Sequence, residues 1–507
     1  MNERSGPGGL TAAAGRCLPS GMRSPSGPVF ASVTEAIGGT PLFRLRGAGR
    51  GIAAPVYAKA EFYSVGGSVK DRAALAMIEA AERDGLLRPG GTIVEATSGN
   101  TGIGLTVVGR QRGYRVIVVI SDRSAQEKAD VLRAYGAEVR TGTTAVPRQH
   151  PDHLFNFARR VADETPGGWL ANQYDNPANP LAHVATTGPE IWQQTEGRIT
   201  HFVAGVGTGG TISGTGEYLK EVSGGRVRVI GADPENSVFS GGDGSPYYVE
   251  SIGHFLHPET EEDHWPESFH PGAVDEFVRV SDRESLATAR RLARTDGLLA
   301  GPSSGTAVAA ALRVARDLRP SDLVVVLLPD SGRSYLSTVF SDDWMRRWGF
   351  LEEPPGAGRV VTDVLARLAQ NDAQRAPLVT VDRTVTVAQA LKSASAAAPG
   401  DSTPPAALIV APRPSRPYGL TAAEVTGSFS PERLAARVTV GRIHPDAPVT
   451  AHADPPLPTA GAGQPVDEVL EALGPPGTGP DAVLVLRDGR AHAILTRAEL
   501  LSAASAR

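Results

Sequence analysis

The chain has 507 residues, with 50 basic and 55 acidic side chains and a formal net charge of −5, a balance that does not indicate a nucleic-acid-binding protein. Its single cysteine excludes an intramolecular disulfide and a cysteine-based zinc site, and is typical of a reducing cytoplasm. No run of about 18 apolar residues is present, so we expect no membrane span.

The first 27 residues are rich in Gly, Ser, Pro and Arg and contain no compact apolar segment. A secretory signal would need such a segment, so we expect residues 1–27 to form a disordered tail.

Short apolar runs alternate with longer helical patterns from about residue 54 to residue 345. The alternating pairs are Val56–Lys59 with Lys70–Asp84, Thr92–Glu95 with Thr101–Gln111, and Val116–Ile120 with Glu127–Tyr135; further apolar runs are Val227–Ala232 and Leu323–Leu328. This alternation predicts an α/β protein with parallel sheets, whose functional loops follow the carboxyl ends of the strands.

Lys70 opens a predicted helix directly after the small residues Gly66, Gly67 and Ser68. Lysine forms Schiff bases with aldehydes when its surroundings lower its pKa. The loop Thr97–Gly102 offers hydroxyls, an amide and backbone N–H groups to an anionic ligand. Together the two segments suggest pyridoxal 5′-phosphate (PLP) held on Lys70, with an amino-acid carboxylate at the loop.

Two further segments supply what PLP needs. The run Val203–Val206 reads as a buried strand, and the glycine-rich loop that follows it, residues 207–211, precedes a helical pattern from Ile212 to Lys220. A loop of this kind at a helix start is suited to bind phosphate. Ser303 lies ahead of an Ala-rich helix and is a candidate partner for the pyridine nitrogen.

These four segments, in this order and spacing, resemble the cysteine synthase/cystathionine β-synthase family of fold-type II PLP-dependent enzymes. The resemblance runs from about Thr34 to Leu351 and is strongest to the cystathionine β-synthases, in Gln173-Tyr174, Asn179–His183, Leu328–Ser331 and Ser341–Trp344. It implies a catalytic domain over residues 28–352 with two α/β subdomains, and a homodimer. It also implies roles for single residues: Lys70 bears PLP and acts as catalytic base, Asn100 bonds the ring hydroxyl, Gly207, Thr208, Gly209, Gly210 and Thr211 hold the phosphate, Ser303 faces the pyridine nitrogen, and Thr97, Ser98, Thr101 and Gln173 bind the substrate carboxylate.

The expected reaction is β-replacement on L-serine, or on an O-activated serine, by a thiol. A serine hydroxyl opposite the pyridine nitrogen cannot hold it protonated, which favours loss of the β-substituent over transamination. The leading expectation is cystathionine synthesis from serine and homocysteine. The alternatives are cysteine synthesis from O-acetyl- or O-phosphoserine and sulfide, a specialised β-substituted alanine synthase, a dehydratase, and a sensor without catalysis. The specialised alternative rests on Ser251 and His254, which stand where cystathionine β-synthases usually carry Gly and Tyr.

Beyond a Pro/Gly-rich stretch at 352–358 we expect a linker over 353–375 and a separate module over 376–507. In this module Gly419–Val425 echoes Ile494–Leu500, and each follows an apolar run. The repeat resembles a degenerate α+β tandem of regulatory CBS domains, which would imply an adenosyl ligand. Glu424 and Glu499 stand where ligand-binding members usually place an aspartate, a departure that argues against that ligand.

Metal and haem sites are not expected. His150, Asp152 and His153 lie near Pro147 and Pro151 and read as a surface loop, and no His-Glu-x-x-His motif is present. Cys17 lacks the context of the haem-binding segment that precedes the catalytic domain in some animal cystathionine β-synthases.

Overall fold

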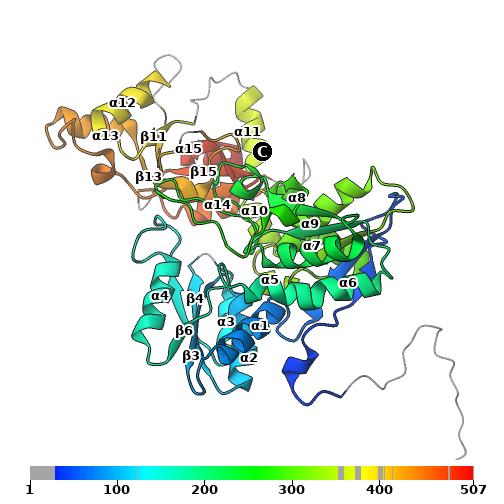
Figure 1. Cartoon of the computed structure of the whole chain (residues 1–507). Helices are drawn as coiled ribbons and strands as arrows, with labels where there is room; N and C mark the ends of the chain where they lie inside the picture. The colour runs from blue at the N-terminus through cyan, green and yellow to red at the C-terminus, as the bar shows by residue number, and fades with distance from the viewer. Residues whose placement is uncertain are drawn as a thin grey trace, which may run out of the picture.

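The computed structural model describes residues 29–505 apart from residues 123, 352–358, 371–377, 398–403, 405, 414 and 478–479. The expected tail over residues 1–27 and the first and last parts of the expected linker lie outside the described residues. Figure 1 shows three parts: a small α/β subdomain, a larger one, and a C-terminal part that in this view stands above the small subdomain and beside α8 and α10 of the large one.

The small subdomain is built on a fully parallel sheet in the order β5-β4-β3-β6. Its strands are β3 (Thr92–Thr97), β4 (Arg115–Ser121), β5 (Glu138–Gly142) and β6 (Gly168–Leu170). Its helices are α1 (Lys70–Arg83), α2 (Asn100–Gln111), α3 (Gln126–Ala134) and α4 (Leu154–Glu164). Alternate residues of β3 face opposite layers, because Ile93 packs with α1 and α2 whereas Val94 packs against α4. Burial on both faces explains the nearly continuous apolar runs in the sequence.

The large subdomain is built on a six-stranded sheet in the order β1-β2-β10-β7-β8-β9, parallel except for the edge strand β1. Its strands are β1 (Leu42–Arg44), β2 (Val56–Ala60), β7 (His201–Gly205), β8 (Arg228–Pro234), β9 (Glu276–Val280) and β10 (Val324–Leu328). Its helices are α5 (Ala178–Ala182), α6 (Gly188–Gln194), α7 (Gly210–Ser223), α8 (Asp282–Asp296), α9 (Pro302–Ala315) and α10 (Asp342–Arg347). Helix α9 covers one face and α7 the other, with a separate apolar cluster on each side.

The C-terminal part contains two units of similar topology, each a three-stranded sheet whose first pair is parallel and second pair antiparallel. The first unit comprises β11 (Thr380–Asp382), α12 (Val387–Ala396), β12 (Ala407–Val410), β13 (Val425–Phe429) and α13 (Pro431–Thr439). The second comprises α11 (Val361–Gln370), β14 (Thr459–Gly461), α14 (Val466–Ala472), β15 (Ala482–Arg487), β16 (Arg490–Thr496) and α15 (Arg497–Ser505). One apolar cluster joins β12 to β15, so the two sheets share a core.

The structure differs from expectation at two places in this region. Helix α11 occupies the middle of the segment expected as linker, and its apolar face is buried in the second unit. The echoing segments also stand at different positions in their units: Glu424 ends a 3-10 turn before β13, whereas Glu499 lies in α15. What the segments share is a local Thr-x-x-Glu bond pattern, in which the backbone amide and hydroxyl of Thr421 donate to Glu424, and those of Thr496 to Glu499.

No helix in the described part of the chain combines the length and apolar character that a membrane crossing requires.

Candidate active site

Lys70 is the first residue of α1 and is held from both sides. The Asp71 carboxylate accepts from the Gly66 amide at 2.7 Å, and the Val69 amide donates to the Pro329 carbonyl at 2.8 Å. Burial lowers the pKa of the Lys70 amine to about 8, while the Asp330 carboxylate opposes the shift. Near neutral pH a useful fraction of this amine is therefore uncharged, as nucleophilic and basic lysines require.

Arg72, one residue further along, anchors α1 to the large subdomain. Its guanidinium contacts Glu61 and Glu190, each at 2.7 Å, and Lys59 reaches Glu190 at 2.6 Å. Burial opposes ionisation of Glu190, but Arg72 and Lys59 lower its pKa to about 2. Because none of these charged side chains lines the cavity near Lys70, the network is structural.

The predicted carboxylate loop lies between β3 and α2. Gly99 has φ of +131°, and a Cβ there would come within 2.6 Å of the Lys128 side chain, so glycine is required. Thr101 donates its hydroxyl proton to Gln173 Oε1, and the Gln173 amide reaches the Ala96 carbonyl at 3.4 Å. Two segments far apart in sequence thus form one polar wall.

The predicted phosphate loop joins β7 to α7, which begins at Gly210. Gly209 has φ of +86°, and a Cβ at Gly207 would lie 2.6 Å from the Ser251 carbonyl oxygen. Asn179 donates to the Thr208 hydroxyl at 3.1 Å. Tight packing of this kind leaves room for a ligand only on the open side of the loop, where backbone N–H groups at the start of α7 favour an anion.

Ser303 and Asn100 are the two residues that the sequence suggests for contact with a pyridine ring. Ser303, at the start of α9, is fully buried, and its hydroxyl has no partner among the described residues. Asn100 donates to Asp330 Oδ2 at 2.8 Å, and Tyr335 donates to the same oxygen at 2.7 Å. An unpaired buried hydroxyl costs about 1–3 kcal/mol, so Ser303 is suited to receive a ligand atom such as a pyridine nitrogen.

A cavity of about 770 Å³ brings the predicted residues together. The following predicted site residues line it: Lys70, Thr97, Ser98, Asn100, Thr101, Gln173, Gly207 and Thr208. A smaller space of about 30 Å³ lies between Lys70 and the phosphate loop, and Gly209 and Thr211 line that space. Gly210 and Ser303 line neither space; Gly210 packs against Asn179, and Ser303 lies behind Pro302, which does line the cavity.

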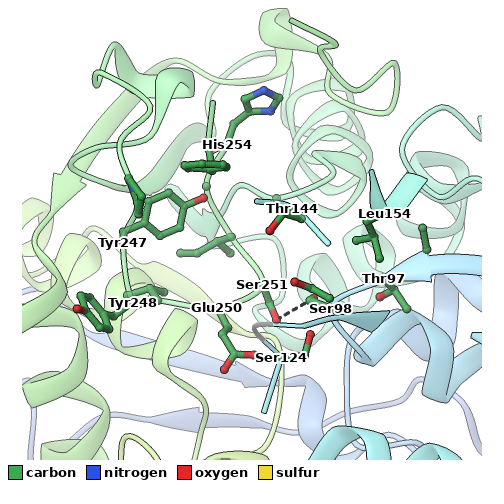
Figure 2. A pocket seen from close by; sticks show the side chains of 18 of the residues that line it. Thr97, Ser98, Ser124, Thr144, Leu154, Tyr247, Tyr248, Glu250, Ser251 and His254 are labelled. Carbon is green, nitrogen blue, oxygen red and sulfur yellow. Dashed lines mark hydrogen bonds between the residues drawn. The ribbon is translucent and has the colours of Figure 1, made fainter. Parts of the chain in front are cut away.

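The loop 246–257 closes the opposite side of the cavity. Figure 2 shows Ser251 and Ser98 facing each other, with their hydroxyl oxygens 3.5 Å apart. Ser251 has φ of +74°, a conformation that favours glycine, so the serine holds backbone strain at this position. His254 lines the same cavity and is bonded through Nε2 to Asp263 at 2.7 Å. The two departures from the expected family pattern therefore both lie at the substrate cavity.

The C-terminal part holds this loop in place. Arg413 donates to the carbonyls of Asp243 at 2.7 Å and Leu256 at 3.3 Å, and Arg490 donates to that of Pro246 at 3.2 Å. Residues 421–423 also line the cavity. The active-site wall is consequently shared between the catalytic part and the C-terminal part.

Several site residues were not found by sequence reasoning. Lys128 is fully buried and reaches Glu250 at 2.9 Å, which ties the loop to the small subdomain. Glu95 is also fully buried, and burial raises the pKa of its carboxyl to about 8, although the backbone amides of Gln173 and Asn172 oppose the shift. Asp330 was noted only as part of the segment Leu328–Ser331, with no role of its own. Nothing in the sequence marks such single charged residues, because Asp330 meets Asn100 across 230 positions and Lys128 meets Glu250 across 122.

No group of three or more His, Cys, Asp or Glu side chains is placed to hold a metal ion within the described ranges.

Comparison with known proteins gives a consistent result. Residues 33–330 match the family of pyridoxal-phosphate dependent enzymes. Cystathionine beta-synthase of Apis mellifera is 42% identical over 331 residues, which are 64% of this chain and 64% of that protein. Cysteine synthase 1 of Emericella nidulans is 41% identical over 330 residues, which are 64% of this chain and 88% of that protein.

A solved structure of O-ureido-L-serine synthase is 38% identical, with a TM-score of 0.56 over 62% of this chain and 98% of that one. A mutant of O-ureido-L-serine synthase bound to O-ureido-L-serine has a TM-score of 0.57 at 34% identity, over 68% of this chain and 99% of that one. The family match covers more than half of the chain and includes Lys70, the loops 97–102 and 207–211, and Ser303. The chain therefore belongs to the family of pyridoxal-phosphate dependent enzymes and has the fold-type II architecture.

Proposed function

We propose that the protein replaces the β-substituent of L-serine, or of an O-activated serine, by a thiol, with homocysteine as the leading nucleophile and cystathionine as the product. The observation that carries the proposal is the convergence of Lys70, the hydroxyl-rich loop and the glycine loop on one cavity. Similarity to cystathionine beta-synthases and to a cysteine synthase supports the same reaction class.

The residues present fit PLP. Lys70 would hold its aldehyde carbon, the loop 207–211 its phosphate, and the unpaired Ser303 hydroxyl its ring nitrogen. Asn100 would reach the ring hydroxyl while keeping its bond to Asp330. When bound, PLP supplies an electron sink for negative charge at the substrate α-carbon.

The chain's own groups then perform three tasks. Thr97, Ser98, Thr101 and Gln173 hold the substrate carboxylate with hydroxyl, amide and backbone donors. The Lys70 amine, with its lowered pKa, removes the α-proton and returns it to the same carbon. The loop 246–257 closes over the cavity and excludes water, since a water molecule would compete with the incoming nucleophile.

A specialised β-substituted alanine synthase is the second candidate. Ser251 and His254 support it, because both alter the wall that the nucleophile must pass. The similarity to O-ureido-L-serine synthase is in line with a nucleophile other than homocysteine.

For the C-terminal part we propose a degenerate tandem of CBS domains without an adenosyl ligand. The repeated strand order supports the tandem. Both carboxylate oxygens of Glu424 are engaged, one by Arg413 and Arg416 and the other by Thr421, which leaves neither for a ribose hydroxyl. Calorimetric titration with S-adenosylmethionine and ATP tests this proposal, and heat of binding for either would contradict it.

The first experiment is a visible absorbance spectrum of the purified protein with L-serine, O-acetylserine or O-phosphoserine, followed by homocysteine or sulfide and by product identification. A change with serine that reverses with homocysteine supports cystathionine synthesis. A response only to an activated serine, or reversal only by another nucleophile, supports the alternatives. A protein that remains colourless with added PLP would contradict catalysis altogether.

A further inference from the structure

Arg148 lies in the connection between β5 and α4 and lines the active-site cavity. Its guanidinium carbon sits 4.1 Å from the ring centroid of Phe155, whose ring meets that of Tyr174 edge-on at 4.9 Å. Tyr174 directly follows Gln173, which bonds Thr101 of the carboxylate loop. Arg148 is therefore separated by two ring contacts from the place where the first amino acid would bind.

Arg148 forms no ion pair with a carboxylate among the described residues. The two carboxylates whose charges act on it are already bonded: Asp263 pairs with His254 at 2.7 Å and Asp175 with His264 at 2.9 Å. Burial lowers the pKa of the Arg148 guanidinium, yet the group stays charged. A half-buried guanidinium without an anion is unfavourable, so an anionic occupant of the cavity would be stabilised there.

Within the described part of the chain, few side chains that line the cavity carry a fixed positive charge. Lys70 and Arg148 are the basic side chains among the described residues that line the cavity, histidines aside. His153 has its Nδ1 3.5 Å from the Arg148 guanidinium, and burial together with Arg148 lowers the pKa of its imidazole to about 4. This histidine is neutral at physiological pH and can bond an anion but not attract it over a distance.

We propose that Arg148 binds the carboxylate of the second substrate, and that the nucleophile is therefore a thiol that carries an acid group. This inference rests on the proposed β-replacement and narrows its nucleophile to anionic thiols. It also explains how one cavity holds two substrates apart: the first is fixed by its carboxylate near Lys70, and the second by its acid group at the other end, so that the two reacting ends meet between them. Sulfide and uncharged nucleophiles would gain nothing from Arg148.

The test compares Arg148→Gln and Arg148→Lys with the control Arg160→Gln in full-length holoenzyme. Arg160 is a matched arginine, 5.2 Å over the Phe157 ring, but its side chain is 41% exposed, pairs with Asp152 at 3.4 Å and does not line the cavity. The nucleophiles are L-homocysteine, mercaptopropionate and its uncharged isostere mercaptopropionamide. The serine step is followed alone by absorbance, so that an effect on the donor side is separated from one on the nucleophile side.

A lost charge-assisted bond predicts that Arg148→Gln lowers kcat/KM for homocysteine and mercaptopropionate by about tenfold to a hundredfold. The value for mercaptopropionamide should stay the same, Arg148→Lys should recover part of the loss, and Arg160→Gln should match wild type. Equal losses for the acid and the amide, or no loss for the acid, would overturn the proposal.

A second measurement does not depend on turnover. Calorimetry with methylthiopropionate, which has no free thiol or amine, should show binding to wild type and Arg160→Gln and much weaker binding to Arg148→Gln. Equal affinity in all three proteins would refute the role of Arg148. If serine donors produce no absorbance change and no product forms, the proposed function fails, while this calorimetric comparison still decides whether Arg148 is an anion site.

Discussion

Replacement of Glu95 by Gln should stabilise the protein, and more so as the pH rises. The carboxyl is 1% exposed, and burial raises its pKa from 4.5 to about 8. A folded-state pKa above the unfolded value means that the folded state binds the proton more tightly. The contribution of neutral Glu95 to the free energy of unfolding is therefore fully present below pH 4.5 and is lost as the pH rises through about 8.

The size of the effect follows from about 1.4 kcal/mol for each pKa unit. At pH 6 the folded protein keeps Glu95 neutral while the unfolded chain ionises it, which costs about 2 kcal/mol. At pH 8 the cost reaches about 4 kcal/mol. Glutamine has the same shape and no charge, so Glu95→Gln avoids this cost.

The assay is urea unfolding of wild type and Glu95→Gln at several pH values between 5 and 9, with the difference in unfolding free energy plotted against pH. We expect this difference to grow by about 2 kcal/mol between pH 6 and pH 8 in favour of the variant. A difference that does not change with pH would show that Glu95 is not held neutral and would refute the reasoning.

Three further predictions concern Lys70 and two glycines. Lys70→Ala should abolish turnover and leave the circular dichroism spectrum unchanged. In wild-type apoprotein the rate of PLP uptake should rise with pH through about 8, because only the neutral Lys70 amine reacts. A rate that does not change with pH would contradict the lowered pKa of Lys70. Gly99→Ala should cost about 1–3 kcal/mol of stability and most of the affinity for serine, because its Cβ would collide with the buried Lys128 side chain. The control is Gly113→Ala, which is also at positive φ but has no neighbour within 4 Å and should keep wild-type affinity for serine. Gly489→Ala would place a methyl group 2.3 Å from the Tyr248 ring of the loop 246–257 and should raise the KM for serine. The control is Gly477→Ala, which has a similar φ and no neighbour within 4 Å. Equal KM values in the two variants would argue against contact between the loop and the C-terminal part.

The sequence predicted the parts of the site that are local in the chain. Lys70 and the loop 97–101 lie where helices begin after strands, and apolar periodicity identifies such positions. The strands are correct for the same reason, because parallel strands buried on both faces are nearly continuous apolar runs.

Long-range pairs could not be predicted in this way. Asn100 and Asp330 are 230 residues apart, and Lys128 and Glu250 are 122 apart. A single charged residue in a helix looks solvent-exposed until tertiary structure buries it. The sequence echo between Gly419–Val425 and Ile494–Leu500 does not mark equivalent positions in the two units. Its Thr-x-x-Glu pattern caps the 3-10 turn before β13 in the first unit and α15 in the second.

The shared wall of the cavity affects how this protein can be compared with others. The family match ends at residue 330, yet residues 421–423 line the substrate cavity and Arg490 fixes the loop that closes it. Two proteins with the same catalytic core but different C-terminal parts can therefore differ in substrate preference with no difference in their aligned residues. Conversely, a substitution some 170 positions away in the chain can act as an active-site mutation here. Both parts of the chain form the wall of the cavity, so exchanging the C-terminal part between relatives offers a way to alter the shape of that cavity.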